Sequence, residues 1–161
     1  MSKVKRKLTT ILATDCVGFS RRMEENEELT LENLKACRSL IDPLVKDFGG
    51  RIFYTAGDSV IAEFESPVEC VNAAIGFQKA IYDRNKTLGE TSKLDWRVGI
   101  HLDDVIIEGD NLFGDGVNLA ARIKSVASSN EILTTQAIYN SIRSEKNMTY
   151  NWNDTSTYIK H

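Results

Sequence analysis

Two aspartates stand where an apolar, β-branched stretch gives way to a glycine-containing turn. Asp15 follows residues 8–14 and precedes Gly18, and Asp58 follows Gly57 between two apolar segments. Carboxylates at strand ends lie at a sheet edge with open space before them, where two of them could hold the divalent cations that phosphoryl chemistry requires. Spacing alone favours a plainer interpretation, in which both are turn aspartates that bond their own backbone.

The segment directly after Asp15 could serve the same chemistry. Residues 16–20 read Cys16-Val-Gly-Phe19-Ser20, a tight turn that leads toward a helix. Backbone N–H groups of such a turn, together with the helix N-terminus, can bind the oxygens of a phosphate. The sequence therefore allows an anion site beside the first aspartate, with Phe19 and Ser20 as candidate substrate-binding residues.

A third candidate is the pair Asn118 and Arg122, which are four residues apart in a segment expected to be helical. This spacing places both side chains on one face of the helix. A fixed guanidinium can stabilise charge that develops on a phosphate, and a neighbouring amide can orient a ribose. By itself the pair is equally compatible with a solvated helix face.

The elements that must position these residues alternate short β-branched segments with amphipathic helices. Ser66-Pro67-Val68-Glu69 is typical of a helix start, with serine at the N-cap and proline in the first turn. The order predicts an α+β sheet with helices packed on one face, and Leu119, Ile123 and Val126 as the apolar stripe of one helix. The expected strands are 8–15, 51–56, 60–64, 94–102, 104–108 and 131–135; the expected helices carry residues 34–48, 67–88, 114–128 and 136–145; and 148–161 is expected to be strand-rich.

Composition narrows the class of protein. A chain of 161 residues with 42% hydrophobic content is the size of one domain with one core. A net charge of −3 and a pI near 5.5 argue against a nucleic-acid-binding surface. Three dispersed cysteines indicate reduced thiols, and no segment has the apolar length of a membrane span. We therefore expect a cytoplasmic protein, with residues 1–6 as a basic tail.

Taken together and in order, five segments resemble the class III adenylyl/guanylyl cyclase catalytic domain. The resemblance runs from about residue 7 to about residue 135, and the family's usual last strand is missing or short after Tyr158-Ile-Lys. It implies one catalytic domain over 1–161, a ferredoxin-like βαββαβ core with additions, and a head-to-tail homodimer. The segments are Thr14-Asp-Cys-Val-Gly-Phe-Ser20, Gly49-Gly-Arg-Ile52, Gly57-Asp58, Arg97-Val-Gly-Ile-His101 and Phe113-Gly-Asp-Gly-Val-Asn118-Leu-Ala-Ala-Arg122.

The resemblance also implies a role for each candidate residue. Asp15 and Asp58 match the family's metal-binding aspartates, and the carbonyl of Cys16 matches a backbone ligand of the two ions, Mg²⁺ or Mn²⁺. Asn118 and Arg122 match the pair that positions ribose and stabilises the transition state from the partner chain. The implied reaction closes a nucleoside triphosphate into a 3′,5′-cyclic monophosphate and releases pyrophosphate.

Two departures concern the nucleotide base. Tyr54 and Asn111 stand where adenylyl cyclases usually carry a lysine and an aspartate that read adenine. The tyrosine ring would shrink the pocket, and an amide offers one donor and one acceptor, as a pyrimidine edge demands. Such a chain looks like the pyrimidine cyclases of bacterial Pycsar anti-phage systems, whose product activates a separate effector protein. We expect UTP to be favoured over CTP.

Three alternatives remain open at this point. The first is a purine cyclase in which Tyr54 and Asn111 are neutral substitutions that do not change the base preference. The second is a nucleotide-binding regulatory domain without turnover, which the intact Asp15, Asp58 and Arg122 argue against. The third is a diguanylate cyclase, which shares the core but carries a Gly-Gly-Asp/Glu-Glu-Phe hairpin that this chain lacks.

Overall fold

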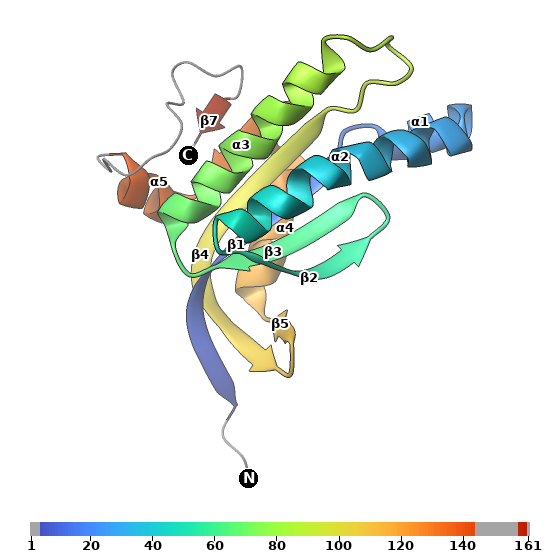
Figure 1. Cartoon of the computed structure of the whole chain (residues 1–161). Helices are drawn as coiled ribbons and strands as arrows, with labels where there is room; N and C mark the ends of the chain where they lie inside the picture. The colour runs from blue at the N-terminus through green and yellow to red at the C-terminus, as the bar shows by residue number, and fades with distance from the viewer. Residues whose placement is uncertain (1–3, 144–157, 161) are drawn as a thin grey trace.

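The computed structural model describes residues 4–143 and 158–160, and within them one mixed sheet carries five helices (Figure 1). Most of the predicted elements are present, with ends shifted by a few residues. The strands are β1 (Lys5–Cys16), β2 (Arg51–Ala56), β3 (Ser59–Phe64), β4 (Trp96–Glu108), β5 (Asn111–Phe113), β6 (Glu131–Thr134) and β7 (Tyr158–Lys160). The helices are α1 (Phe19–Glu25), α2 (Glu27–Asp47), α3 (Pro67–Asn85), α4 (Asp115–Val126) and α5 (Gln136–Ile142).

The strand order confirms the predicted ferredoxin-like core. The path through the sheet is β2-β3-β1-β4-β6-β7, and β5 pairs with β4 off this path. β1 lies antiparallel between β3 and β4, and β2 is antiparallel to β3. Each long helix therefore connects two parallel strands that are separated by one antiparallel neighbour, as in a split βαβ unit. This topology puts the end of β1 beside the β2–β3 turn.

Helices cover both faces of the sheet, so the prediction of one covered face is wrong. Alternate residues of β1 belong to two different hydrophobic clusters. Leu12 packs with residues of α2, α3 and α5, whereas Ile11 and Ala13 pack with Val105 and with Ala120 of α4. Figure 1 shows α2 and α3 in front of the sheet and α4 behind it. Side chains alternate along a strand, and here each alternate set has its own helical cover.

The contact between α4 and β4 is made by small residues. A Cβ added to Gly99 would lie 2.3 Å from the backbone nitrogen of Lys124, so only glycine lets α4 approach this closely. Gly116 and Ala120 are the buried residues of α4, whereas Val126 is 72% exposed. The predicted apolar stripe of α4 is therefore not its buried face, because a close backbone approach selects small side chains there.

Two boundaries also differ from the sequence-based prediction. β1 begins at Lys5, so Lys5 and Arg6 pair with β4 and are not part of a tail. β4 is one strand and does not break at Asp103, because its ladder with β1 runs unbroken from Lys5 to Cys16. Of the expected strand-rich end, only β7 lies within the described residues.

Candidate active site

Asp15 lies at the end of β1, where two cationic side chains of the same chain bind it. Arg97 of β4 donates from Nε to Oδ1 at 2.7 Å and from Nη2 to Oδ2 at 3.2 Å. The Lys124 ammonium of α4 lies 3.2 Å from Oδ2. The side chain of Asp15 is 13% exposed, so these pairs are largely shielded from water. Paired positive charges of this kind offset the cost of burying a carboxylate.

Asp58 lies beside Asp15, at the tip of the β2–β3 hairpin. Its Oδ2 accepts a hydrogen bond of 2.9 Å from the backbone N–H of Cys16, the residue after Asp15. Partial burial raises the pKa of the Asp58 carboxyl above its ordinary value; the Cys16 N–H lowers it, and the negative charge of Asp15 adds to the rise. The fold thus brings together the two carboxylates that the sequence singles out.

The residues around this carboxylate pair suit a hard divalent cation. Mg²⁺ is commonly bound by one or two carboxylates and substrate phosphates, without a complete protein cage. Among residues 4–143 and 158–160, no group of three or more His, Cys, Asp and Glu side chains could hold a metal. Burial and the Asp58 charge raise the pKa of the Cys16 thiol well above its usual range, so this residue offers its carbonyl and not a thiolate. A divalent cation bound by two carboxylates and a carbonyl would have further coordination positions for phosphate oxygens.

The Asp58 carboxylate should lower the stability of the metal-free fold at neutral pH. A carboxyl whose pKa is raised by folding contributes stability only while protonated, and that contribution is lost as the pH rises through its folded pKa. Asp58→Asn removes the buried charge, and its amide oxygen can still accept from Cys16. We expect a higher Tm than wild type at pH 7, measured by circular dichroism without metal.

The sign of this effect is tested by its pH dependence. The gain in Tm should disappear below the ordinary carboxyl pKa of 3.8, where Asp58 is protonated in both folded and unfolded chains. Asp83→Asn, which alters an exposed carboxylate on α3, is the matched control. A lower Tm for Asp58→Asn at pH 7 would show that the carboxylate stabilises the fold.

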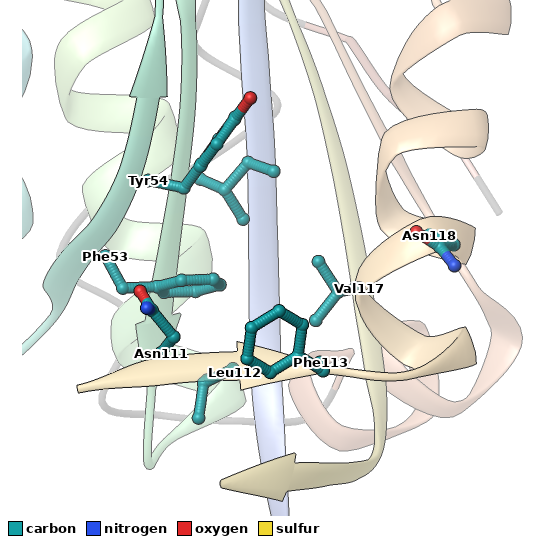
Figure 2. Close-up of a pocket in the computed structure, with 8 residues that line it drawn as sticks. Phe53, Tyr54, Asn111, Leu112, Phe113, Val117 and Asn118 are labelled. Carbon is teal, nitrogen blue, oxygen red and sulfur yellow. The ribbon is translucent and has the colours of Figure 1, made fainter. Parts of the chain in front are cut away.

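A cavity of about 460 Å³ contains both predicted base-reading residues (Figure 2). Tyr54 comes from β2 and is 52% exposed, and Asn111 comes from β5. Figure 2 shows the Asn111 amide beside the Phe53 ring, and the Phe113 ring nearer to Val117. The structure therefore brings these two residues, distant in sequence, into one pocket. Its lining comprises Phe53, Tyr54, Ile61, Asn111, Leu112, Phe113, Val117 and Asn118.

Two local irregularities build this pocket. The register of β2 against β3 shifts between Ile52 and Tyr54, which marks a bulge at Phe53. A bulge lets consecutive residues face the same side, so Phe53 and Tyr54 both line the cavity. On the other side, β4 turns at Gly109 (φ 61°) into the short β5, which presents Asn111. Neither the bulge nor β5 is predicted from the sequence.

Asn118 and Arg122 lie on α4, as predicted, and both are exposed. Asn118 lines the cavity with Tyr54 and Asn111. Within the described part of the chain, the guanidinium of Arg122 makes no ion pair or hydrogen bond. Residues two apart on a helix are about 200° apart around its axis, so Arg122 points away from the side on which Lys124 meets Asp15. Arg122 and the carboxylate pair thus face different directions.

Phe19 and Ser20 open α1, directly after Gly18 in the left-handed region (φ 69°). Ser20 is exposed. The Phe19 ring packs beside Gly57 against the hydrophobic cluster that contains Leu12. The α1 N-terminus therefore lies next to the hairpin that carries Asp58. The Phe19 side chain supports this hairpin, which leaves the backbone of this turn as the group available to a ligand.

The sequence reasoning assigned no role to Arg97 and did not consider Lys124. Both bind Asp15, and Arg97 also donates from Nη1 to the carbonyl of Ser125 at 2.9 Å. One signal was available for Lys124: it follows Gly116 and Ala120 at intervals of four on the helix, which is the spacing of a buried face.

A scan against family models matches residues 2–159 to the adenylate and guanylate cyclase catalytic domain. The chain belongs to this family. Among curated proteins, this cyclase domain is 40% identical over 137 residues to "Putative adenylate cyclase 3" of Rhizobium meliloti, covering 84% of the chain and 23% of that protein. It is 30% identical over 138 residues to the serine/threonine-protein kinase pkn2 of Myxococcus xanthus, covering 85% of the chain and 17% of the kinase. The domain thus spans less than a quarter of either relative.

Solved structures agree on the fold of this cyclase domain. A structure titled adenylate/guanylate cyclase/hydrolase from Silicibacter pomeroyi has a TM-score of 0.79 and 33% identity, covering 86% of this chain and 81% of that one. The adenylyl cyclase CyaB from P. aeruginosa has a TM-score of 0.77 at 24% identity, covering 88% and 83%. In the part of the chain that the structure describes, no helix is long and apolar enough to cross a membrane.

Proposed function

We propose that this domain is a nucleotide cyclase, a lyase that forms a 3′,5′-cyclic nucleoside monophosphate and pyrophosphate. The observation that carries the proposal is the pairing of Asp15 and Asp58 through the Cys16 backbone, in a chain of the cyclase family. The ribose 3′-oxygen attacks the α-phosphorus in line. A bond from that oxygen to phosphorus forms, the bond from phosphorus to the α–β bridging oxygen breaks to release pyrophosphate, and the 3′-hydroxyl proton passes to solvent.

The residues of this chain bind and orient the reacting groups. Asp15, Asp58 and the Cys16 carbonyl would hold divalent cations, Mg²⁺ or Mn²⁺, which when bound supply positive charge to the phosphate oxygens. The backbone at Phe19 and Ser20 would bind the triphosphate next to the β2–β3 hairpin. Asn118 would orient the ribose, and Arg122 would stabilise the charge that develops on the α-phosphate.

We propose that two chains form each site, in a head-to-tail homodimer. Lys124 already meets Asp15 of its own chain, and Arg122 lies on a different side of α4. An arginine that faces away from its own carboxylates can serve those of a second chain. Tyr54, Asn111 and Asn118 line one pocket, so one chain would supply these residues together with Arg122. The partner chain would supply the metal-binding residues.

We further propose a pyrimidine substrate, with UTP favoured over CTP. Tyr54 and Asn111 lie in one cavity with the rings of Phe53 and Phe113, which suits a flat base. Asn111 can offer a donor and an acceptor to a pyrimidine edge, and Tyr54 occupies space that a two-ring base would need. By the resemblance to Pycsar cyclases, the product would be a second messenger in cytoplasmic antiviral defence that activates a separate effector protein.

In a competition among ATP, GTP, CTP and UTP, we expect UTP or CTP to be consumed with the highest kcat/KM. The double variant Tyr54→Lys with Asn111→Asp should lower pyrimidine use by roughly tenfold or more, since a mismatched edge leaves buried polar groups unpaired at about 1–3 kcal/mol each. Quantifying each cyclic product by mass spectrometry measures both effects.

Tyr82→Lys is the matched control, because it places a lysine on a half-exposed surface tyrosine of α3, outside the cavity. It should leave the base preference unchanged. A wild-type preference for ATP or GTP over both pyrimidines would overturn the base assignment and leave the proposed cyclisation intact.

A further inference from the structure

Lys124 forms the most shielded ion pair of the carboxylate site. Its side chain and that of Asp15 are both 13% exposed, and its Nζ lies 3.2 Å from Oδ2. The pair Lys86–Asp83 on α3, in contrast, is 59% and 55% exposed. Coulombic attraction is stronger where water is excluded, so the ammonium of Lys124 has a much larger effect on its carboxylate than a surface lysine has.

The carboxylate of Asp15 is nearly saturated by its own chain. Oδ1 accepts from Arg97 Nε, whereas Oδ2 is shared between Arg97 Nη2 and the Lys124 ammonium. A carboxylate oxygen offers about two lone-pair positions. A cation that binds through Oδ2 must therefore displace one of these two groups.

Lys124 is the group that can leave. Arg97 is anchored twice, because its Nη1 also donates to the carbonyl of Ser125 at 2.9 Å. The backbone of Lys124 is held against Gly99, but within residues 4–143 and 158–160 its ammonium forms an ion pair with Asp15 and with no other carboxylate. Its four-carbon stem can therefore swing away without moving α4. The charge of Lys124 also acts on Asp58, so it serves both carboxylates.

We infer that Lys124 is a built-in competitor of the metal: its ammonium occupies the cation position at Asp15 in the metal-free chain and leaves the carboxylate when a divalent ion binds. The inference rests on the proposed metal-binding role of Asp15 and Asp58. It makes Lys124 a positioning residue that sets the metal affinity of the site. In the metal-free chain, Lys124 also supplies the positive charge that the paired carboxylates need.

The test is direct binding of Mn²⁺, followed by the electron paramagnetic resonance signal of the free ion. Lys124→Met keeps the length of the side chain and removes its charge, so we expect its Kd for Mn²⁺ to fall by roughly tenfold relative to wild type. Lys124→Arg, which keeps the charge, and Lys86→Met, which deletes an exposed charge on α3, should bind Mn²⁺ as wild type does.

A second readout follows Lys124 itself. Amine labelling of the wild-type chain, quantified by mass spectrometry, should modify Lys124 faster with Mn²⁺ than without, while the labelling of Lys86 stays constant. Equal or weaker Mn²⁺ binding by a folded Lys124→Met would overturn the inference and leave the metal site standing. Absence of Mn²⁺ binding in wild type and in every variant would overturn both the inference and the proposed metal-binding role.

Discussion

Asp58→Ala and Asp15→Ala should each lower the rate of cyclisation at least about a thousandfold, equivalent to about 4 kcal/mol of transition-state stabilisation. The two carboxylates are the metal ligands that we propose, and Asp58 also accepts a hydrogen bond from the Cys16 backbone. Removing either one removes charge from the cation site and takes nothing from either hydrophobic cluster. Initial rates with saturating Mn²⁺ and UTP measure the loss.

Controls must separate lost chemistry from lost folding. Asp15→Ala leaves Arg97 and Lys124 without their carboxylate, so Asp15→Asn, which keeps an oxygen acceptor for Arg97, serves as the gentler variant. Asp83→Ala removes an exposed carboxylate from α3 and should retain full activity. Activity within about tenfold of wild type in a folded Asp58→Ala chain would contradict the two-carboxylate site.

Two inactive variants should restore activity to each other when mixed. If Asp58 and Arg122 serve the same site from opposite chains, a dimer of one Asp58→Ala chain and one Arg122→Ala chain contains one intact site. With random exchange, half of the dimers are mixed, so the expected rate is about a quarter of the wild-type rate. The structural support is the orientation of α4, which turns Arg122 away from the side that meets Asp15.

The matched control mixes Asp58→Ala with Asp15→Ala. Both residues belong to the same half of the site, so neither site of a mixed dimer is intact and no activity should return. Chain exchange is verified by mass spectrometry of differently labelled chains. If exchange is complete and Asp58→Ala with Arg122→Ala remains inactive, then both residues act within one chain or the head-to-tail arrangement is wrong.

Local sequence patterns were sufficient for most strands and for the long helices, whereas the resemblance to the cyclase family supplied the topology and the carboxylate pair. The resemblance implies the split βαβ core, which places the end of β1 next to the β2–β3 hairpin. Short β-branched segments, amphipathic helices and the Gly57-Asp58 turn predict the individual elements. The N-cap is a local example, since the Ser66 hydroxyl accepts from the Glu69 N–H as predicted. These features depend on local periodicity and turn chemistry, which a single sequence contains.

The packing of α4 and the walls of the pocket could not be predicted in the same way. The close approach at Gly99 is a property of two elements together, and it shifts the buried face of α4 from the predicted apolar stripe to Gly116 and Ala120. The bulge at Phe53 and the three-residue strand β5 are too short to leave a periodic signal. The ion pair of Lys124 with Asp15 depends on the packing of α4, because it exists only once α4 lies behind the sheet.

We propose that this domain cyclises a nucleoside triphosphate at the Asp15–Asp58 site. The most direct measurement incubates the purified chain with Mn²⁺ and UTP and quantifies cyclic nucleotide and pyrophosphate together. We expect 3′,5′-cyclic UMP and pyrophosphate in equal amounts, and neither product from Asp58→Ala. Failure of the wild-type chain to form a cyclic product from UTP, CTP, ATP or GTP would contradict this proposal.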